Sequence, residues 1–102
     1  MSAADFIIAK EMHAAGGRYT ARAPGLDADA EAELTWRNAG ADKRIAAHTE
    51  VPDAFRGKGV GRMLVTRMVE EARAEGFKIV PRCSYVEAER RKHPEWADVF
   101  AA

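Results

Sequence analysis

The stretch "EVPDAFRGKGVGRMLV", from Glu50 to Val65, joins two patterns that are typical of different secondary structures. Apolar and polar residues alternate up to Val51, as in a half-buried strand. From Val60 onward an apolar residue recurs at every fourth position, as in an amphipathic helix. Three glycines occupy alternate positions at the junction: Gly57, Gly59 and Gly61. The fold and the site that we expect both depend on this flexible backbone between a strand and a helix.

A glycine-rich helix start is physically suited to binding an anion. The first turn of a helix leaves backbone N–H groups unpaired and carries the positive end of the helix dipole. Side chains normally keep a ligand away from these groups, whereas glycines let a phosphate approach the backbone. The junction therefore predicts an anion-binding loop, and the alternative is a tight connection that binds nothing.

Three phosphate-binding motifs can be compared with this loop. The dinucleotide motif G-x-G-x-x-G would need a glycine at position 62, where the chain has Arg62. The P-loop motif also fails, because the Gly-Lys pair of this chain lacks both the upstream glycine and the following hydroxyl. The third pattern, R/Q-x-x-G-x-G/A, is matched by Arg56, Gly59 and Gly61. This third motif is therefore the one that the junction supports.

Four short strands are expected before the junction, because alternating runs are separated by turn signals. The strands span residues 5–13, 18–23, 30–37 and 44–51, and the turns span 14–17, 24–29 and 38–43. In the third strand, one face carries Ala30, Ala32, Leu34 and Trp36. In the fourth strand, strict alternation places Ile45, Ala47, Thr49 and Val51 on one face and Arg44, Ala46, His48 and Glu50 on the other. The short turns predict an antiparallel meander.

After the junction the chain is expected to continue as helix, strand and short helices. The helix spans residues 60–75, presents Val60, Leu64, Met68 and Ala72 on one side, and ends at Gly76. A fifth strand is predicted over 77–86, and short helical pieces interrupted at Pro94 over 87–100. The resulting fold class is α+β with a mixed sheet, in which the fifth strand lies parallel to the fourth.

Composition restricts the class of protein. The 102 residues are expected to form one small domain over 1–102, and 16 basic and 16 acidic residues give a formal net charge of zero. This balance argues against nucleic-acid and polybasic membrane partners. Cys83 is the one cysteine, so no internal disulfide can form and a cytoplasmic location is expected. No signal-peptide pattern is evident, and no run approaches the roughly 20 apolar residues of a membrane span.

Three stretches together carry a resemblance to a known family: "HTEVPDAFRGKGVGRMLV", "VPRCSYV" and "HPEW". They resemble the GNAT superfamily, and within it the very small stand-alone GNAT-like N-acetyltransferase domain proteins. The resemblance covers about residues 17 to 98. It implies an antiparallel meander, a helix led by the CoA-binding loop, and a following parallel strand that splays from its neighbour. It also implies acetyl-CoA as the co-substrate and no metal.

The resemblance implies where CoA would lie. The pyrophosphate would contact the loop residues Arg56, Gly57, Lys58, Gly59, Val60 and Gly61, and extend as far as Arg62. The pantetheine arm would run beside the fourth strand at Glu50 and Val51. Cys83, in the expected fifth strand, would lie near the thioester at the splay. The basic run at 89–93 could meet the adenosine 3′-phosphate, although such a run is more often a solvated helix face.

Four residues are candidates for the chemistry of acetyl transfer. Glu50 and His48 share a polar strand face and could remove a proton from the amine. Tyr85 could protonate the leaving thiolate, and its alternative role is packing. Cys83 could be a small buried hydrophobe, an unreactive wall of the thioester pocket or an acylated nucleophile. We expect the wall, because an acyl-enzyme requires an activated thiolate and no activating neighbour is evident in the sequence.

The expected function is acetyl-CoA-dependent transfer of an acetyl group to an amine, by direct attack in a ternary complex. Larger relatives build an acceptor pocket from helices between the first two strands, whereas only "AAGG" separates them here. An open acceptor side favours a protein or peptide amine, or a polyamine. The alternative is a CoA-binding or acyl-CoA-binding interaction module with little or no catalytic activity.

Overall fold

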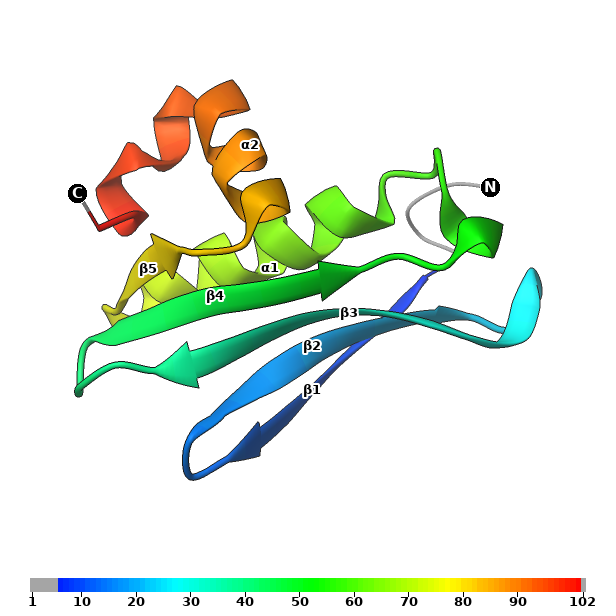
Figure 1. Ribbon diagram of the computed structural model, residues 1–102, viewed down its shortest axis with the longest axis horizontal. Coiled ribbons are helices and arrows are strands. Elements are labelled where there is room, and N and C mark those ends of the chain that lie inside the picture. The colour runs from blue at the N-terminus through cyan, green and yellow to red at the C-terminus, as the bar shows by residue number, and fades with distance from the viewer. Residues whose placement is uncertain (1–5, 102) are drawn as a thin grey trace.

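Five strands form one sheet in the order β1-β2-β3-β4-β5, and the helices lie on one of its faces (Figure 1). The computed structural model describes residues 6–101. The strands are β1 (Ile7–His13), β2 (Gly16–Ala23), β3 (Asp27–Asn38), β4 (Lys43–Glu50) and β5 (Lys78–Pro81). The helices are α1 (Val60–Glu75) and α2 (Ser84–Lys92), with 3₁₀ turns η2 (Asp53–Phe55) and η3 (Pro94–Val99). Asp5, where the first predicted strand begins, lies outside the described residues.

The expected sheet topology and its splay are confirmed. Strands β1 to β4 pair antiparallel, and β5 pairs parallel to β4 from Lys43↔Lys78 to Ala46↔Pro81. The pairing stops there although β4 continues to Glu50. The amides of Arg82 and Cys83 both donate to the Ala46 carbonyl, at 3.1 and 2.9 Å, and α2 then begins. The outer edge of β4 beyond Ala46 is therefore separated from β5.

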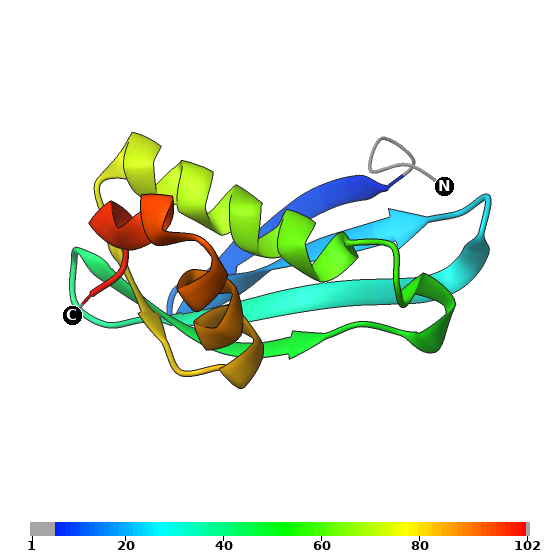
Figure 2. The ribbon, with the colours of Figure 1, turned by 90° about the horizontal axis from the view of Figure 1, so that it is seen from above.

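Helix α1 packs its predicted apolar stripe on the sheet. Val60, Leu64, Met68 and Ala72 are all buried, and Val65 and Val69 widen the stripe. These side chains share one core cluster with the inward residues of β2 and β3, including Tyr19, Ala21, Leu34 and Trp36. Figure 2 shows α1 lying across the sheet. Gly76 ends the helix at φ 84°, as predicted. Within residues 6–101 no helix is long and apolar enough to cross a membrane.

The predicted faces of β4 are wrong for its first half. Thr35 of β3 pairs with His48 and Trp36 pairs with Ala46, so Ala47 is an extra residue in β4. Such a bulge reverses the sides on which the flanking residues lie. Ala46 is consequently buried beneath the helices, although the strict alternation placed it with His48 on the polar face.

Three further predictions were wrong because a local signal had another cause. Gly16 and Gly17 belong to β2 and not to the turn, and an added Cβ would lie 2.1 Å from the Trp36 carbonyl oxygen at Gly16 and 2.7 Å from the Trp36 ring at Gly17. Asp27–Asp29, predicted as turn, begin β3. The fifth strand stops at Pro81, so Cys83 caps α2 and Tyr85 lies in the first turn of that helix.

Candidate functional site

The loop between β4 and α1 turns on two glycines in the left-handed backbone region. Gly57 has φ 76° and Gly59 has φ 77°, a conformation that side chains other than glycine rarely adopt. Apart from chain neighbours, no heavy atom lies within 4 Å of a Cβ built at either position. The first helical hydrogen bond of α1 runs from the Met63 amide to the Gly59 carbonyl, at 3.1 Å. The amides of residues 60–62 precede that bond and face the start of the helix.

Gly61 serves a different purpose from the other two glycines. A Cβ at this position would lie 2.6 Å from the Tyr85 hydroxyl, closer than real Cβ contacts allow. Gly61 therefore leaves room for the Tyr85 side chain of α2 against the first turn of α1. This contact brings the phenol of Tyr85 to the start of α1.

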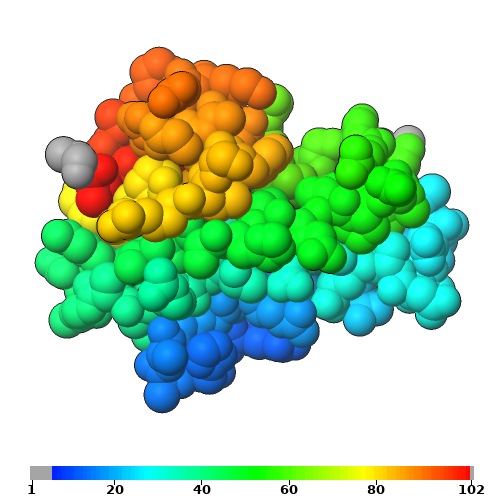
Figure 3. Space-filling model, in the orientation of Figure 1, coloured from blue at the N-terminus to red at the C-terminus, as the bar shows by residue number. Residues whose placement is uncertain are grey.

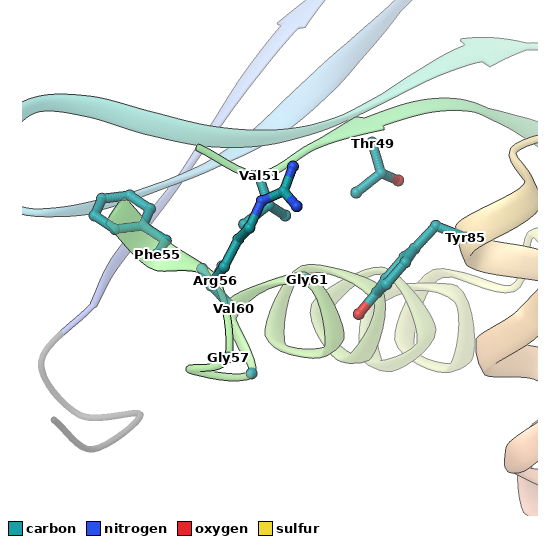
Figure 4. A pocket seen from close by; sticks show the side chains of 9 residues that line it. Thr49, Val51, Phe55, Arg56, Gly57, Val60, Gly61 and Tyr85 are labelled. Carbon is teal, nitrogen blue, oxygen red and sulfur yellow. The ribbon is translucent and has the colours of Figure 1, made fainter. Parts of the chain in front are cut away.

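A cavity of about 420 Å³ opens where the loop, β4 and α2 meet. It is lined by Thr49, Val51, Phe55, Arg56, Gly57, Gly59, Val60, Gly61 and Tyr85. Figure 4 shows Arg56 and Tyr85 flanking this space, with Thr49 and Val51 along the strand. Most of the residues predicted to contact CoA are thus brought together around one cavity.

Sequence reasoning missed two residues of this cavity. Thr49 lies on the same strand face as Val51, so the alternation of β4 could have identified it. Phe55 is fully buried in η2 and packs edge-on against Phe6, with ring centroids 5.0 Å apart. That contact anchors the loop to the core directly before Arg56. The Arg56 side chain itself pairs with Asp53 at 2.8 Å and is largely exposed.

Three predicted CoA residues do not line this cavity: Glu50, Lys58 and Arg62. Lys58 and Arg62 line a neighbouring hollow of about 410 Å³ that also includes Ile8, Gly59, Met63, Thr66, Arg67 and Glu70. This hollow meets the first cavity at Gly59. Of the predicted pair, Arg62 also donates from Nε to the Glu89 carboxylate, at 3.2 Å.

His48 and Glu50 lie on the face of the sheet opposite the cavity. Thr49 pairs with the buried Leu34 and faces the helices, and successive side chains of a strand point to opposite sides. The His48 Nε2 and Glu50 Oε2 atoms are 3.6 Å apart, and the two side chains are 61% and 68% exposed. The structure therefore brings the two predicted bases together, but beside the splay and outside the cavity.

Cys83 lies at the splay, as expected, although not on a strand. Its Sγ donates to the Thr49 hydroxyl at 3.3 Å, and the residue is half-buried. Because Thr49 lines the cavity, Cys83 lies directly behind the cavity wall. A threonine hydroxyl is not a base that could take the thiol proton, so this contact does not activate the sulfur.

Tyr85 remains protonated at neutral pH. Burial raises the pKa of its phenol, and the negative charge of Glu89 raises it further, while Arg62 acts in the opposite direction. A protonated phenol at the cavity wall can donate a hydrogen bond or a proton to a ligand.

The basic run at 89–93 is largely paired within its own helical region. Arg90 and Arg91 contact Glu87, while Lys92 and His93 contact the Glu89 carboxylate that also pairs with Arg62. The His93 ring stacks on Trp96 with centroids 4.0 Å apart. The run therefore shows no free cluster of cations toward the cavity within the described part of the chain.

Comparisons with known proteins agree with this geometry. The family model for GCN5-related N-acetyl-transferases matches residues 18–99. The NMR solution structure of a GCN5-like protein from Staphylococcus aureus, provisionally named as an N-acetyltransferase, superposes with a TM-score of 0.70. The two sequences are 26% identical over 92% of this chain and 88% of that chain. No curated protein matches this chain.

The fold and the loop define a GNAT-type protein, and the family match extends over most of the sequence. The chain belongs to the GCN5-related N-acetyltransferase family. The predicted family, fold class and enzyme class are thereby confirmed.

Proposed function

We propose that this chain binds acetyl-CoA in the loop cavity and transfers the acetyl group to an amine. The observation that carries the proposal is the position of the cavity between two left-handed glycines, the start of α1 and the splayed edge of β4. The residues suit CoA, because Gly57 and Gly59 leave open space where a phosphate would approach helix amides. The family match supports the same class of activity.

Each part of the cavity has a role in this proposal. The loop amides and Arg56 hold the pyrophosphate, as a helix start and a guanidinium suit a doubly charged anion. The free edge of β4 at Glu50 and Val51 offers backbone groups along which the pantetheine arm can lie. Thr49, with Cys83 behind it, and Tyr85 surround the end that receives the thioester.

The chemistry divides between the two sides of β4. Acetyl-CoA supplies the acetyl group as an activated thioester. On the acceptor side, Glu50, assisted by His48, takes a proton from the amine, whose nitrogen then attacks the carbonyl carbon through the splay. The C–N bond forms, the C–S bond breaks, and Tyr85 donates its proton to the leaving thiolate. The phenol regains a proton from solvent, and Glu50 releases to solvent the proton that it took from the amine.

The acceptor side favours an extended amine. His48 and Glu50 are exposed on an open face, and β4, the loop, β5 and α2 meet at the surface in Figure 3. A protein or peptide amine or a polyamine can reach such a face, whereas a small amine would have few contacts there. This setting, and the lone reduced thiol, are consistent with a cytoplasmic enzyme.

Binding and turnover measured in parallel test the proposal. Acetyl-CoA affinity is determined by calorimetry, and CoA release is followed over a panel of peptide N-termini, lysine peptides and polyamines. We expect micromolar binding, of about −8 kcal/mol, together with turnover of at least one acceptor class. Tight binding with no turnover on any acceptor would instead favour the CoA-binding interaction module.

Replacing Cys83 by alanine is expected to leave at least about a tenth of the wild-type kcat. Thr49, the side-chain partner of its sulfur, cannot serve as a base, and direct attack by the amine needs no acyl-enzyme. Initial-rate plots against both substrates should then intersect. The N-terminus of a helix can stabilise a thiolate, so the acyl-enzyme is the alternative to be tested. Near-complete loss of activity, parallel lines and an acetylated Cys83 peptide after incubation with acetyl-CoA alone would establish it.

A further inference from the structure

A buried carboxylate lies on α2, one helical turn after Tyr85, which lines the cavity. Glu89 of α2 is only 2% exposed, although most acidic side chains remain at the surface. Its Oε1 accepts from Arg62 Nε at 3.2 Å and lies 3.8 Å from His93 Nε2, while its Oε2 accepts from Lys92 at 3.5 Å. A buried carboxylate of this kind is strongly disfavoured unless such partners compensate it.

Glu89 and Tyr85 act on α1 as a pair. They are four residues apart on α2 and therefore lie on the same side of that helix. Their partners are consecutive residues of the first turn of α1: the phenol contacts Gly61 and the carboxylate contacts Arg62. Two neighbouring contacts thus fix how α2 meets the helix start that borders the cavity.

We propose that Glu89 is a positioning residue, which holds Arg62 and the first turn of α2 so that the Tyr85 phenol stays against Gly61 at the cavity wall. The inference rests on the proposed role of Tyr85 as proton donor. Glu89 does not line the cavity and is not expected to touch CoA. It acts through the geometry and the charge that it imposes on its two neighbours.

The charges of Glu89 and Arg62 have opposite effects on the pKa of the Tyr85 phenol, which provides a sharp test. Glu89 raises the pKa of Tyr85 and Arg62 lowers it, besides the larger effect of burial and a further contribution from Cys83. In Glu89→Gln, which keeps the side-chain shape, the pKa of Tyr85 should fall. In Arg62→Met it should rise, because Glu89 then acts on the phenol without a compensating cation.

The phenol is titrated by NMR of tyrosine-labelled protein without ligand. The chain has two tyrosines, and Tyr85→Phe identifies the signal of Tyr85. Tyr19 is buried against Glu71, and its pKa lies far above the usual range, so the two phenols titrate over different pH ranges. Glu87→Gln is the matched control: it removes a charge from the same helix that pairs with Arg90, and Tyr85 should titrate as in wild type.

Opposite shifts in the two variants support the inference. Unchanged titration in both, or a rise in Glu89→Gln, would overturn it. A fall in both also supports it, because the phenol then leaves its buried position against Gly61 when either partner is lost. If Arg62→Met does not fold, the double variant Arg62→Met, Glu89→Gln replaces it. The phenol of the double variant should titrate above that of Glu89→Gln alone, since only the single variant retains the Arg62 cation; equal titration overturns the inference.

A second measurement connects Glu89 and Arg62 to catalysis. In the active enzyme the alkaline limb of the kcat–pH profile should move in the same direction as the phenol titration in each variant. An alkaline limb that stays fixed while the phenol shifts would contradict the role in proton donation. The ligand-free titration does not depend on CoA binding, so a protein that fails to bind CoA but shows opposite shifts would refute the proposed function alone.

Discussion

Replacement of Glu50 by glutamine and of His48 by alanine in one chain is expected to lower kcat for acetyl transfer by about 100-fold, and each single change by at least about tenfold. The two side chains lie 3.6 Å apart on the acceptor side of β4 and form the proposed base. A general base typically contributes about 10²–10⁴-fold to the rate. Because neither side chain lines the cavity, acetyl-CoA affinity measured by calorimetry should stay within about threefold of wild type.

Glu33→Gln is the control for the charge that Glu50→Gln removes. Glu33 lies directly opposite Glu50 on β3, on the same open face, and pairs with Arg18 at 3.8 Å. Its neutralisation should leave kcat close to wild type. If the double variant at 48 and 50 retains the wild-type rate, another group or solvent removes the proton, and the proposed base is wrong.

Gly59→Asp is expected to weaken acetyl-CoA binding by at least tenfold, which is about 1.4 kcal/mol. The new carboxylate would stand at the start of α1, where the pyrophosphate is proposed to lie. The fold should persist, since no atom other than chain neighbours lies within 4 Å of the added Cβ and aspartate tolerates positive φ better than most residues. An acidic side chain at a helix start also stabilises the helix. Calorimetry with acetyl-CoA measures the loss, and circular dichroism checks the fold.

Two controls separate charge from backbone strain in that experiment. Gly59→Asn has nearly the same shape without the charge, so its loss of affinity should be clearly smaller. Gly40→Asp places the same side chain on another left-handed glycine, φ 79°, in the β3–β4 turn, and should leave CoA affinity unchanged. Unaltered affinity in a folded Gly59→Asp protein would exclude the loop as the pyrophosphate site. Gly61→Asp is unsuitable, because it would displace Tyr85.

The elements that follow from local pattern could be predicted. The apolar stripe of α1 and its end at Gly76 depend on spacing within one helix, and both are present in the structure. The glycines next to a helix start predict the loop, and the resemblance to the GNAT superfamily predicts how the strands are arranged around it. Val51, Arg56 and the glycines of the loop consequently lie around one cavity.

Features that depend on contacts between distant segments could not be predicted. The bulge at Ala47 exists only in the pairing of β4 with β3, so alternation within β4 gives no sign of it. Positions 16 and 17 need glycine because a Cβ there would clash with the backbone or ring of Trp36 on the neighbouring strand. Strand β5 ends at Pro81, because the next two amides, of Arg82 and Cys83, both donate to the Ala46 carbonyl of β4. The sequence pattern predicts Tyr85 on a strand, so it gives no sign that Tyr85 and Glu89 lie one turn apart on the same side of a helix.

The alternation of side chains in the second half of β4 makes this strand a partition between two sides that can be altered separately. Thr49 lies on the side proposed for the acyl donor, while its neighbours His48 and Glu50 lie on the side proposed for the acceptor. Point substitutions can therefore alter preference for one substrate without altering contacts to the other. Deletion of Ala47 would remove the bulge and leave His48, Thr49 and Glu50 paired with the same residues of β3, so both sides of the strand would be retained. The separation of the two sides is thus set by the pairing of residues 48–50 with β3 and not by the extra residue.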